Sequence, residues 1–137
     1  MAAPIDLSGN WKVGKSDNLD AFLSAVGVNI AKRKIASAAP LTLVISQDGS
    51  KITIEAKSVK NRKSTFEVGA GDFDDESPDG RPVKAKAFWE GSSLVVEAKP
   101  ADGKGKGLKV VRTIDGDTMQ QTMTCGDVTC VRNFSKC

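Results

Sequence analysis

Apolar and polar residues alternate along most of the chain after about residue 41, and turn residues interrupt the alternation at short intervals. The stretches 51–56 and 64–68 show the alternation clearly. Successive side chains of a β-strand point to opposite faces, so this pattern predicts strands with one dry and one wet face. Turn signals such as Asp115-Gly116 recur at the spacing of roughly 8 to 12 residues that is typical of a barrel or a sandwich. With a first strand around Trp11, a buried anchor, the chain is predicted to form about ten antiparallel strands.

Two short helices are predicted between the first two strands. The first is expected to begin after an N-cap at Ser16 and to end at Gly27, because apolar residues recur at helical spacing: Leu19, Phe22, Leu23 and Val26. The second is expected to run from Val28 to about Ala38 and to stop at Pro40. Its apolar residues share one face: Ile30, Ala31, Ile35 and Ala38. We expect this helix pair to cover the barrel as a lid.

Two arginines near the C-terminus occupy strand positions that are predicted to face inward. The alternation in 108–114 groups Arg112 with the apolar residues, and the alternation in 128–134 does the same for Arg132. Two-residue turns at Asp115-Gly116 and Gly126-Asp127 predict the pairs Arg112 with Met119, Met119 with Phe134, and Gln121 with Arg132. The arginines then lie two strand spacings apart, roughly 10 Å, with a stagger of two residues.

The inward arginines indicate an anionic ligand. No Asp or Glu is present on that face of the three strands. A buried guanidinium without a partner costs several kcal/mol, so an anion from outside the chain is the simplest partner. The alternatives are that the arginines lie in water at an open rim, or that they pair with a carboxylate from another strand.

The predicted inner faces are too small and too polar for a solid core. Besides the arginines they include Ala85, Ala87, Gln121 and Cys130, and aromatic residues make up 5% of the chain. A closed sheet of this size with such a lining is expected to enclose a cavity.

Composition narrows the function further. The 137 residues are expected to form one domain, 1–137, and the net charge of +3 is small for a nucleic-acid-binding protein. Histidine is absent, and no Cys-x-x-Cys pair or phosphate-binding glycine loop occurs, so we expect no catalytic residues, no metal and no cofactor. The N-terminus resembles no signal peptide and no apolar run is long enough to span a membrane, which predicts a cytoplasmic protein with reduced cysteines. We expect a monomer.

Several ordered motifs resemble one family over essentially the whole chain. They are Gly9-Asn10-Trp11-Lys12, Ser16-Asp17-Asn18-Leu19-Asp20, Gly27-Val28, Arg33-Lys34, Lys60-Asn61, Phe66-Glu67-Val68-Gly69, Phe73-Asp74-Asp75, Asp79-Gly80-Arg81 and Val128-Thr129-Cys130-Val131-Arg132-Asn133-Phe134. The sequence resembles the intracellular lipid-binding proteins, which include the fatty-acid-binding and cellular retinoid-binding proteins. The resemblance implies a ten-stranded up-and-down β-barrel of the lipocalin-like (calycin) type, a helix-turn-helix lid and a hydrophobic ligand held inside.

The resemblance also implies roles for particular residues. Arg132 and Arg112 match the family's carboxylate-binding arginines, with Gln121 between them, whereas Phe134 stands where the family has a tyrosine and removes one hydrogen bond. Val59 replaces the phenylalanine at the portal, the opening to the cavity beneath the lid, and Asp79 matches an inward acid nearby. The remaining residues expected at the cavity or portal are Leu19, Val28, Ile35, Ala36, Met119 and Cys130.

The function expected from this resemblance is the binding and transport of a long-chain fatty acid. A retinoic acid carrier is the alternative within the fold, because Phe88-Trp89-Glu90 and Gly27-Val28-Asn29 are more similar to that branch. A structural membrane-associated protein is the alternative from another class. Transient contact of the lid with anionic membranes is expected from a basic cluster, unless this is ordinary surface charge: Lys32, Arg33, Lys34, Lys60, Arg62 and Lys63.

Overall fold

The computed structural model describes residues 5–58, 61–76, 80–103 and 106–137. Ten strands and two helices follow one another along the chain. They are β1 (Gly9–Asp17), α1 (Leu19–Val26), α2 (Ile30–Ala38), β2 (Thr42–Asp48), β3 (Lys51–Lys57), β4 (Arg62–Glu67), β5 (Asp72–Glu76), β6 (Pro82–Glu90), β7 (Ser93–Pro100), β8 (Leu108–Asp115), β9 (Thr118–Cys125) and β10 (Val128–Lys136).

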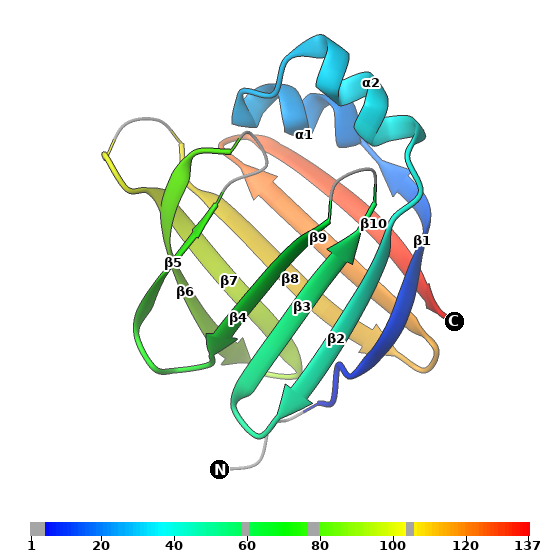
Figure 1. Cartoon of the computed structure of the whole chain (residues 1–137), viewed down its shortest axis with the longest axis vertical. Coiled ribbons are helices and arrows are strands. Elements are labelled where there is room, and N and C mark those ends of the chain that lie inside the picture. The colour runs from blue at the N-terminus through cyan, green and yellow to red at the C-terminus, as the bar shows by residue number, and fades with distance from the viewer. Residues whose placement is uncertain (1–4, 59–60, 77–79, 104–105) are drawn as a thin grey trace.

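All ten strands belong to one antiparallel sheet that curves into a barrel (Figure 1). Apart from β4 and β5, strands that follow one another in sequence pair with each other, and β1 also pairs with β10. The predicted up-and-down barrel with a two-helix lid is therefore confirmed. In the described part of the chain no ladder joins β4 to β5, which are the two ends of the strand order.

Side chains bridge the gap between β4 and β5, which we call the seam. The rings of Phe66 and Phe73 stack across it with their centroids 5.0 Å apart. Further toward the lid, Asp75 accepts hydrogen bonds from Arg62 and Ser64. The seam is thus apolar at one end and polar at the other.

Two apolar clusters fill different parts of the barrel. The larger one, away from the lid, contains Trp11, whose Nε1 donates to the carbonyl of Leu7 at 3.0 Å, as expected of a buried anchor. The second, the lid cluster, joins the helices to β9 and β10 and consists of Leu19, Phe22, Leu23, Val26, Val28, Met123, Cys125 and Cys130. The space between these clusters holds the cavity described below.

Helix α1 begins two residues later than the sequence predicted. Its N-cap is Asn18 rather than Ser16, because β1 continues through a bulge after Val13 and places Ser16 opposite Arg132. The C-terminal prediction is confirmed: Gly27 has φ +113°, and its N–H donates to the carbonyls of Leu23 and Ser24.

Helix α2 turns its apolar face toward solvent, contrary to what a lid helix led us to expect. The side chains that face the rest of the protein are Arg33 and Ala36, both half-buried. Arg33 donates to Asp20 and to the carbonyl of Val28, which fixes this orientation. The face opposite, which we call the outer face of α2, is exposed and consists of Ile30, Ala31, Ile35 and Ala38.

Asn18 provides a test of how the lid is attached to the barrel. Its backbone is left-handed (φ 65°, ψ 26°), and its Nδ2 donates to the carbonyl of Thr129 on β10 at 3.0 Å. Asn18→Ala removes this hydrogen bond and places alanine in an unfavourable conformation, so we expect a loss of about 1–2 kcal/mol in the free energy of unfolding, measured with urea. Asn18→Gly removes only the bond and is expected to lose less. Equal losses in the two variants would show that the left-handed backbone contributes nothing.

Candidate ligand-binding site

A cavity of about 260 Å³ lies inside the barrel beneath the lid. Most of its walls are apolar, with contributions from the strands on both sides of the seam and from Phe22 of α1. Polar groups interrupt this lining at two places. One is Arg112 with Gln121, and the other is Arg62, Ser64 and Asp75 at the seam, with the exposed Glu76 beside them.

Arg112 is held in the cavity by Gln121. The Nε of Arg112 donates to Gln121 Oε1 at 3.0 Å, and Gln121 Nε2 donates to Met123 Sδ at 3.3 Å. Desolvation lowers the pKa of Arg112 to about 10, while the negative charge of Asp75 acts in the opposite direction. Arg112 is therefore a cation at neutral pH. Among the described residues, no acidic side chain makes an ion pair with Arg112.

The register around Arg112 differs from the prediction. The β8–β9 turn consists of Gly116 and Asp117, with Asp115 paired to Thr118, so Arg112 lies opposite Gln121 and not Met119. Gly116 has φ +62°, a left-handed conformation that this turn position requires and that glycine adopts more readily than other residues. The predicted pairs Met119 with Phe134 and Gln121 with Arg132 are confirmed. Arg112, Gln121 and Arg132 consequently form one row across three strands, without the predicted stagger.

Arg132 does not line the cavity that holds Arg112. Its Nε donates to Ser16 Oγ at 2.9 Å, and the side chain lies at a separate opening of about 640 Å³ beneath α1, where Leu19 is another of the lining residues. Burial lowers the pKa of Arg132. The bulge in β1 explains this arrangement, because it brings the Ser16 hydroxyl next to Arg132 on the side away from Gln121.

Three more residues predicted at the site or cavity are packed in the interior instead. Phe134 and Met119 belong to the larger apolar cluster and Cys130 to the lid cluster, and all three are fully buried away from the cavity. Burial raises the pKa of the Cys130 thiol, which Arg132 partly opposes. These positions face inward as the alternation indicated, but inward positions of a small barrel are filled by packing wherever the opposite wall is close.

The lid residues predicted at the cavity or portal have different locations. Val28 is buried in the lid cluster, and the half-buried Ala36 packs against it. Ile35 lies on the outer face of α2 with 54% of its surface exposed, so it does not line the cavity. Val59 and Asp79 lie outside the described residues. No disulfide bond joins any of the described cysteines Cys125, Cys130 and Cys137.

The sequence prediction missed the polar group at the seam. Arg62, assigned to the basic surface cluster, points into the cavity and forms an ion pair with Asp75 (Nη2 to Oδ1, 2.8 Å). A signal was available, because the alternation that places Ser64 and Phe66 inward also places Arg62 inward. Arg33 is not a free surface charge either: its side chain is 17% exposed and pairs with Asp20.

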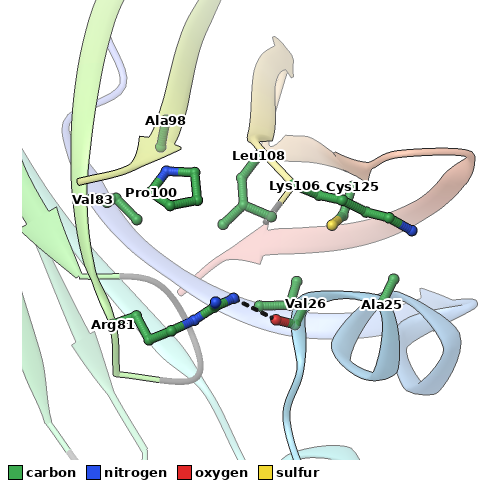
Figure 2. Close-up of a pocket in the computed structure, with 9 residues that line it drawn as sticks. All are labelled: Ala25, Val26, Arg81, Val83, Ala98, Pro100, Lys106, Leu108 and Cys125. Carbon is green, nitrogen blue, oxygen red and sulfur yellow. Dashed lines mark hydrogen bonds between the residues drawn. The ribbon is translucent and has the colours of Figure 1, made fainter. Parts of the chain in front are cut away.

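A second cavity of about 240 Å³ lies at the rim, between the end of α1 and the strands β6 to β8 (Figure 2). Figure 2 shows Arg81 reaching across to α1, where it donates to the carbonyl of Val26 at 3.0 Å. Val83, Ala98 and Leu108 line both this cavity and the inner one, so the two share a wall. The contact with Val26 joins the end of α1 to the start of β6.

The described ranges contain neither a metal-binding cluster nor a membrane-spanning helix. No group of three or more His, Cys, Asp or Glu side chains there is arranged to hold a metal ion. No helix there is both long enough and apolar enough to cross a membrane.

Comparison with known proteins identifies the family. The chain is 38% identical over 129 residues to the 14 kDa fatty acid-binding protein of Schistosoma mansoni, covering 93% of this chain and 95% of the relative. It is 38% identical over 127 residues to the human intestinal fatty acid-binding protein, covering 92% and 95%. No family model matches the chain. The chain belongs to the intracellular lipid-binding family, whose members among its relatives are fatty-acid-binding proteins and cellular retinol-binding proteins.

Solved structures show the same fold. The Schistosoma mansoni fatty acid-binding protein in complex with arachidonic acid has a TM-score of 0.86 at 36% identity, with 95% of each chain covered. Human cRBP IV has a TM-score of 0.88 at 32% identity, with 98% of this chain and 100% of the other covered.

Replacing Arg112 tests how much this cation lowers the free energy of unfolding of the ligand-free protein. At pH 7, below both its usual pKa and the value of about 10 in the fold, Arg112 is charged in the folded and unfolded states alike. The full cost of desolvating the cation is therefore present, and we expect Arg112→Met to raise the free energy of unfolding of the ligand-free protein by about 1–3 kcal/mol, measured with urea. Arg132→Met is the control, and we expect no gain because Arg132 lies at the opening beneath α1 rather than in the inner cavity, and the variant loses the hydrogen bond to Ser16. A loss of stability in Arg112→Met would contradict this account.

Proposed function

We propose that this chain binds a long-chain fatty acid inside the barrel and transports it through the cytoplasm. The observation that carries the proposal is Arg112, a half-buried cation in a largely apolar cavity, paired among the described side chains with the neutral Gln121. A ligand carboxylate supplies the missing charge, and the guanidinium fork suits it because it stays protonated and binds both oxygens. The similarity to fatty-acid-binding proteins supports this assignment.

The remaining energy of binding comes from the acyl chain. Each methylene removed from water contributes about 0.8 kcal/mol, which offsets the loss of motion of the ligand and of the residues that close over it. The carboxylate pairing fixes the direction of the chain and favours acids over esters. Arg132 acts in this proposal as a more distant cation behind Gln121, with a smaller effect on binding.

A retinoid is the second candidate ligand. The similarity to human cRBP IV over nearly the whole chain favours it, and retinoic acid would use the same carboxylate position at Arg112. Against it, a stiff polyene needs a wide, straight space, whereas a flexible acyl chain adapts to a cavity of about 260 Å³. Competition binding of a fatty acid and a retinoid to the purified protein shows which of the two binds more tightly.

Arg112→Gln tests the carboxylate site. We expect it to weaken the binding of hexadecanoic acid by about tenfold or more, because it removes a charge-assisted hydrogen bond worth roughly 1.5–3 kcal/mol. Binding of the methyl ester should change little. Displacement of a fluorescent probe by the acid and by the ester measures both effects.

The control for this experiment is Arg132→Gln, which removes a cation from the same row outside the cavity. We expect it to weaken acid binding less than Arg112→Gln does. If acid and ester lose affinity equally in Arg112→Gln, the carboxylate does not lie at Arg112 and the proposed site is wrong.

We also propose that the outer face of α2 contacts membranes during ligand transfer. Ile30 and Ile35 are 60% and 54% exposed, and the exposed Lys32 and Lys34 lie on the same helix. Apolar side chains next to cations match the interface of an anionic bilayer, where the cations attract the protein and the apolar groups insert. Fewer cations of the predicted basic cluster are free to contact a membrane than expected, because Arg33 and Arg62 form ion pairs within the protein.

Transfer of a fluorescent fatty acid to vesicles tests this contact. We expect Ile30→Ser/Ile35→Ser to slow transfer at every salt concentration, because it removes the groups that insert. Lys32→Gln/Lys34→Gln should slow transfer to anionic vesicles at low salt, and the effect should fade as salt screens the charges.

The control is Lys51→Gln/Lys86→Gln, which removes the same charge from exposed positions on β3 and β6 rather than from a helix. Equal effects of the two lysine pairs would show that net charge alone matters and that α2 is not the contact. Stable cosedimentation of the protein with vesicles would favour the structural membrane role instead of transient delivery.

The proposed carrier acts as a monomer and makes or breaks no covalent bond. The names of the relatives describe binding and transport, which supports the absence of a covalent step. Turnover of an acyl ester by the purified protein would contradict it.

A further inference from the structure

The polar group at the seam lies inside the proposed ligand cavity. We refer to Arg62, Ser64 and Asp75 as the seam cluster. Asp75 Oδ1 accepts from Arg62 Nη2 at 2.8 Å and from Ser64 Oγ at 3.1 Å, and all three residues line the cavity that contains Arg112. The side chains of Arg62 and Asp75 are 39% and 27% exposed, so both are partly withdrawn from bulk water.

Closing the seam does not by itself call for charged residues. Phe66 and Phe73 bridge the same gap with an apolar contact. A partly buried ion pair has little advantage in stability over apolar side chains of similar size, because desolvation offsets the attraction. The seam cluster therefore adds chemistry to the cavity wall that a purely structural closure does not need.

The seam cluster has hydrogen-bonding capacity that its contacts with the described residues leave unused, and its residues line the cavity. The three hydrogen bonds to Asp75 in the described part of the chain, from Arg62, Ser64 and the backbone N–H of Glu76, all end on Oδ1. Oδ2 is thus available as an acceptor, and the guanidinium of Arg62 has further N–H donors. A methylene placed against these groups would displace water without replacing its hydrogen bonds.

A hydroxyl group matches this combination of donor and acceptor. It donates to a carboxylate oxygen and accepts from a guanidinium, whereas a second carboxylate on the ligand would be repelled by Asp75. The cavity volume of about 260 Å³ is below the roughly 300–1,000 Å³ typical of small-molecule pockets, so a chain that fills it contacts both polar places. We infer that the seam cluster is a second polar subsite and that the preferred ligand is a long-chain fatty acid bearing one hydroxyl group along its chain.

This inference rests on the proposed function, because it assumes that the carboxylate is anchored at Arg112. The test is competition binding of hexadecanoic acid and a positional series of its monohydroxy derivatives to the full chain. We expect one range of hydroxyl positions to bind about three- to tenfold more tightly than hexadecanoic acid, the gain of about one hydrogen bond. Hydroxyl positions outside that range should bind more weakly than hexadecanoic acid, because a hydroxyl buried against the apolar walls loses its water.

Variants of the seam cluster assign the preference to these residues. Arg62→Leu/Asp75→Leu removes both charges and keeps the seam filled, and it should abolish the preference while retaining binding of hexadecanoic acid. Thr65→Ala is the matched control, because it removes the hydroxyl of an exposed residue on the same strand that does not line the cavity, and it should keep the preference.

The outcomes separate the two proposals. If the wild-type protein binds hexadecanoic acid but no hydroxylated derivative more tightly, the subsite is refuted and the proposed function stands; this result needs no variant to fold. If the same preference persists in Arg62→Leu/Asp75→Leu, the hydroxyl is recognised elsewhere and the subsite is again refuted. If the wild-type protein binds neither hexadecanoic acid nor its derivatives, the proposed function fails.

Discussion

The proposed ligand site depends on a guanidinium that the described residues leave without a counter-charge. Arg112 is fixed by Gln121 on the neighbouring strand, and the neutral amide orients the cation without neutralising it. An acid at this position would have formed a buried ion pair and removed the driving force for an external anion. The combination of a neutral partner and apolar walls makes the interior selective for a negatively charged amphiphile.

Local sequence pattern predicted about ten antiparallel strands with a helix pair, and the family resemblance indicated the barrel, but the exact register was not predicted. Shifting a strand by two residues keeps every side chain on its face, so alternation is insensitive to the difference between Met119 and Gln121 as the partner of Arg112. The register is decided by the turn alone. In Asp115-Gly116-Asp117 the two-residue loop can be either the first two residues or the last two. The structure selects Gly116 and Asp117.

The sequence predicted only part of the candidate site, because alternation does not determine what each inward side chain contacts. Alternation shows which side chains face inward, and it did so for Arg112, Gln121, Arg132 and Phe134. Whether an inward side chain meets a cavity or a packed neighbour depends on the opposite wall and on irregularities such as the bulge in β1. Those features arise from contacts distant in sequence, which explains why Phe134 is packed and Arg132 turns to Ser16.

The two helices of the lid are attached to the barrel in different ways. Asn18 joins the start of α1 to β10, and Arg81 joins its end to the beginning of β6. Helix α2 is held through Arg33 and Ala36, while the rest of its surface faces outward. Helix α1 is thus attached to the barrel at both ends, whereas α2 is attached along one side only. The two attachments of α1 therefore hold Phe22 in the wall of the cavity, to which α2 contributes no described residue.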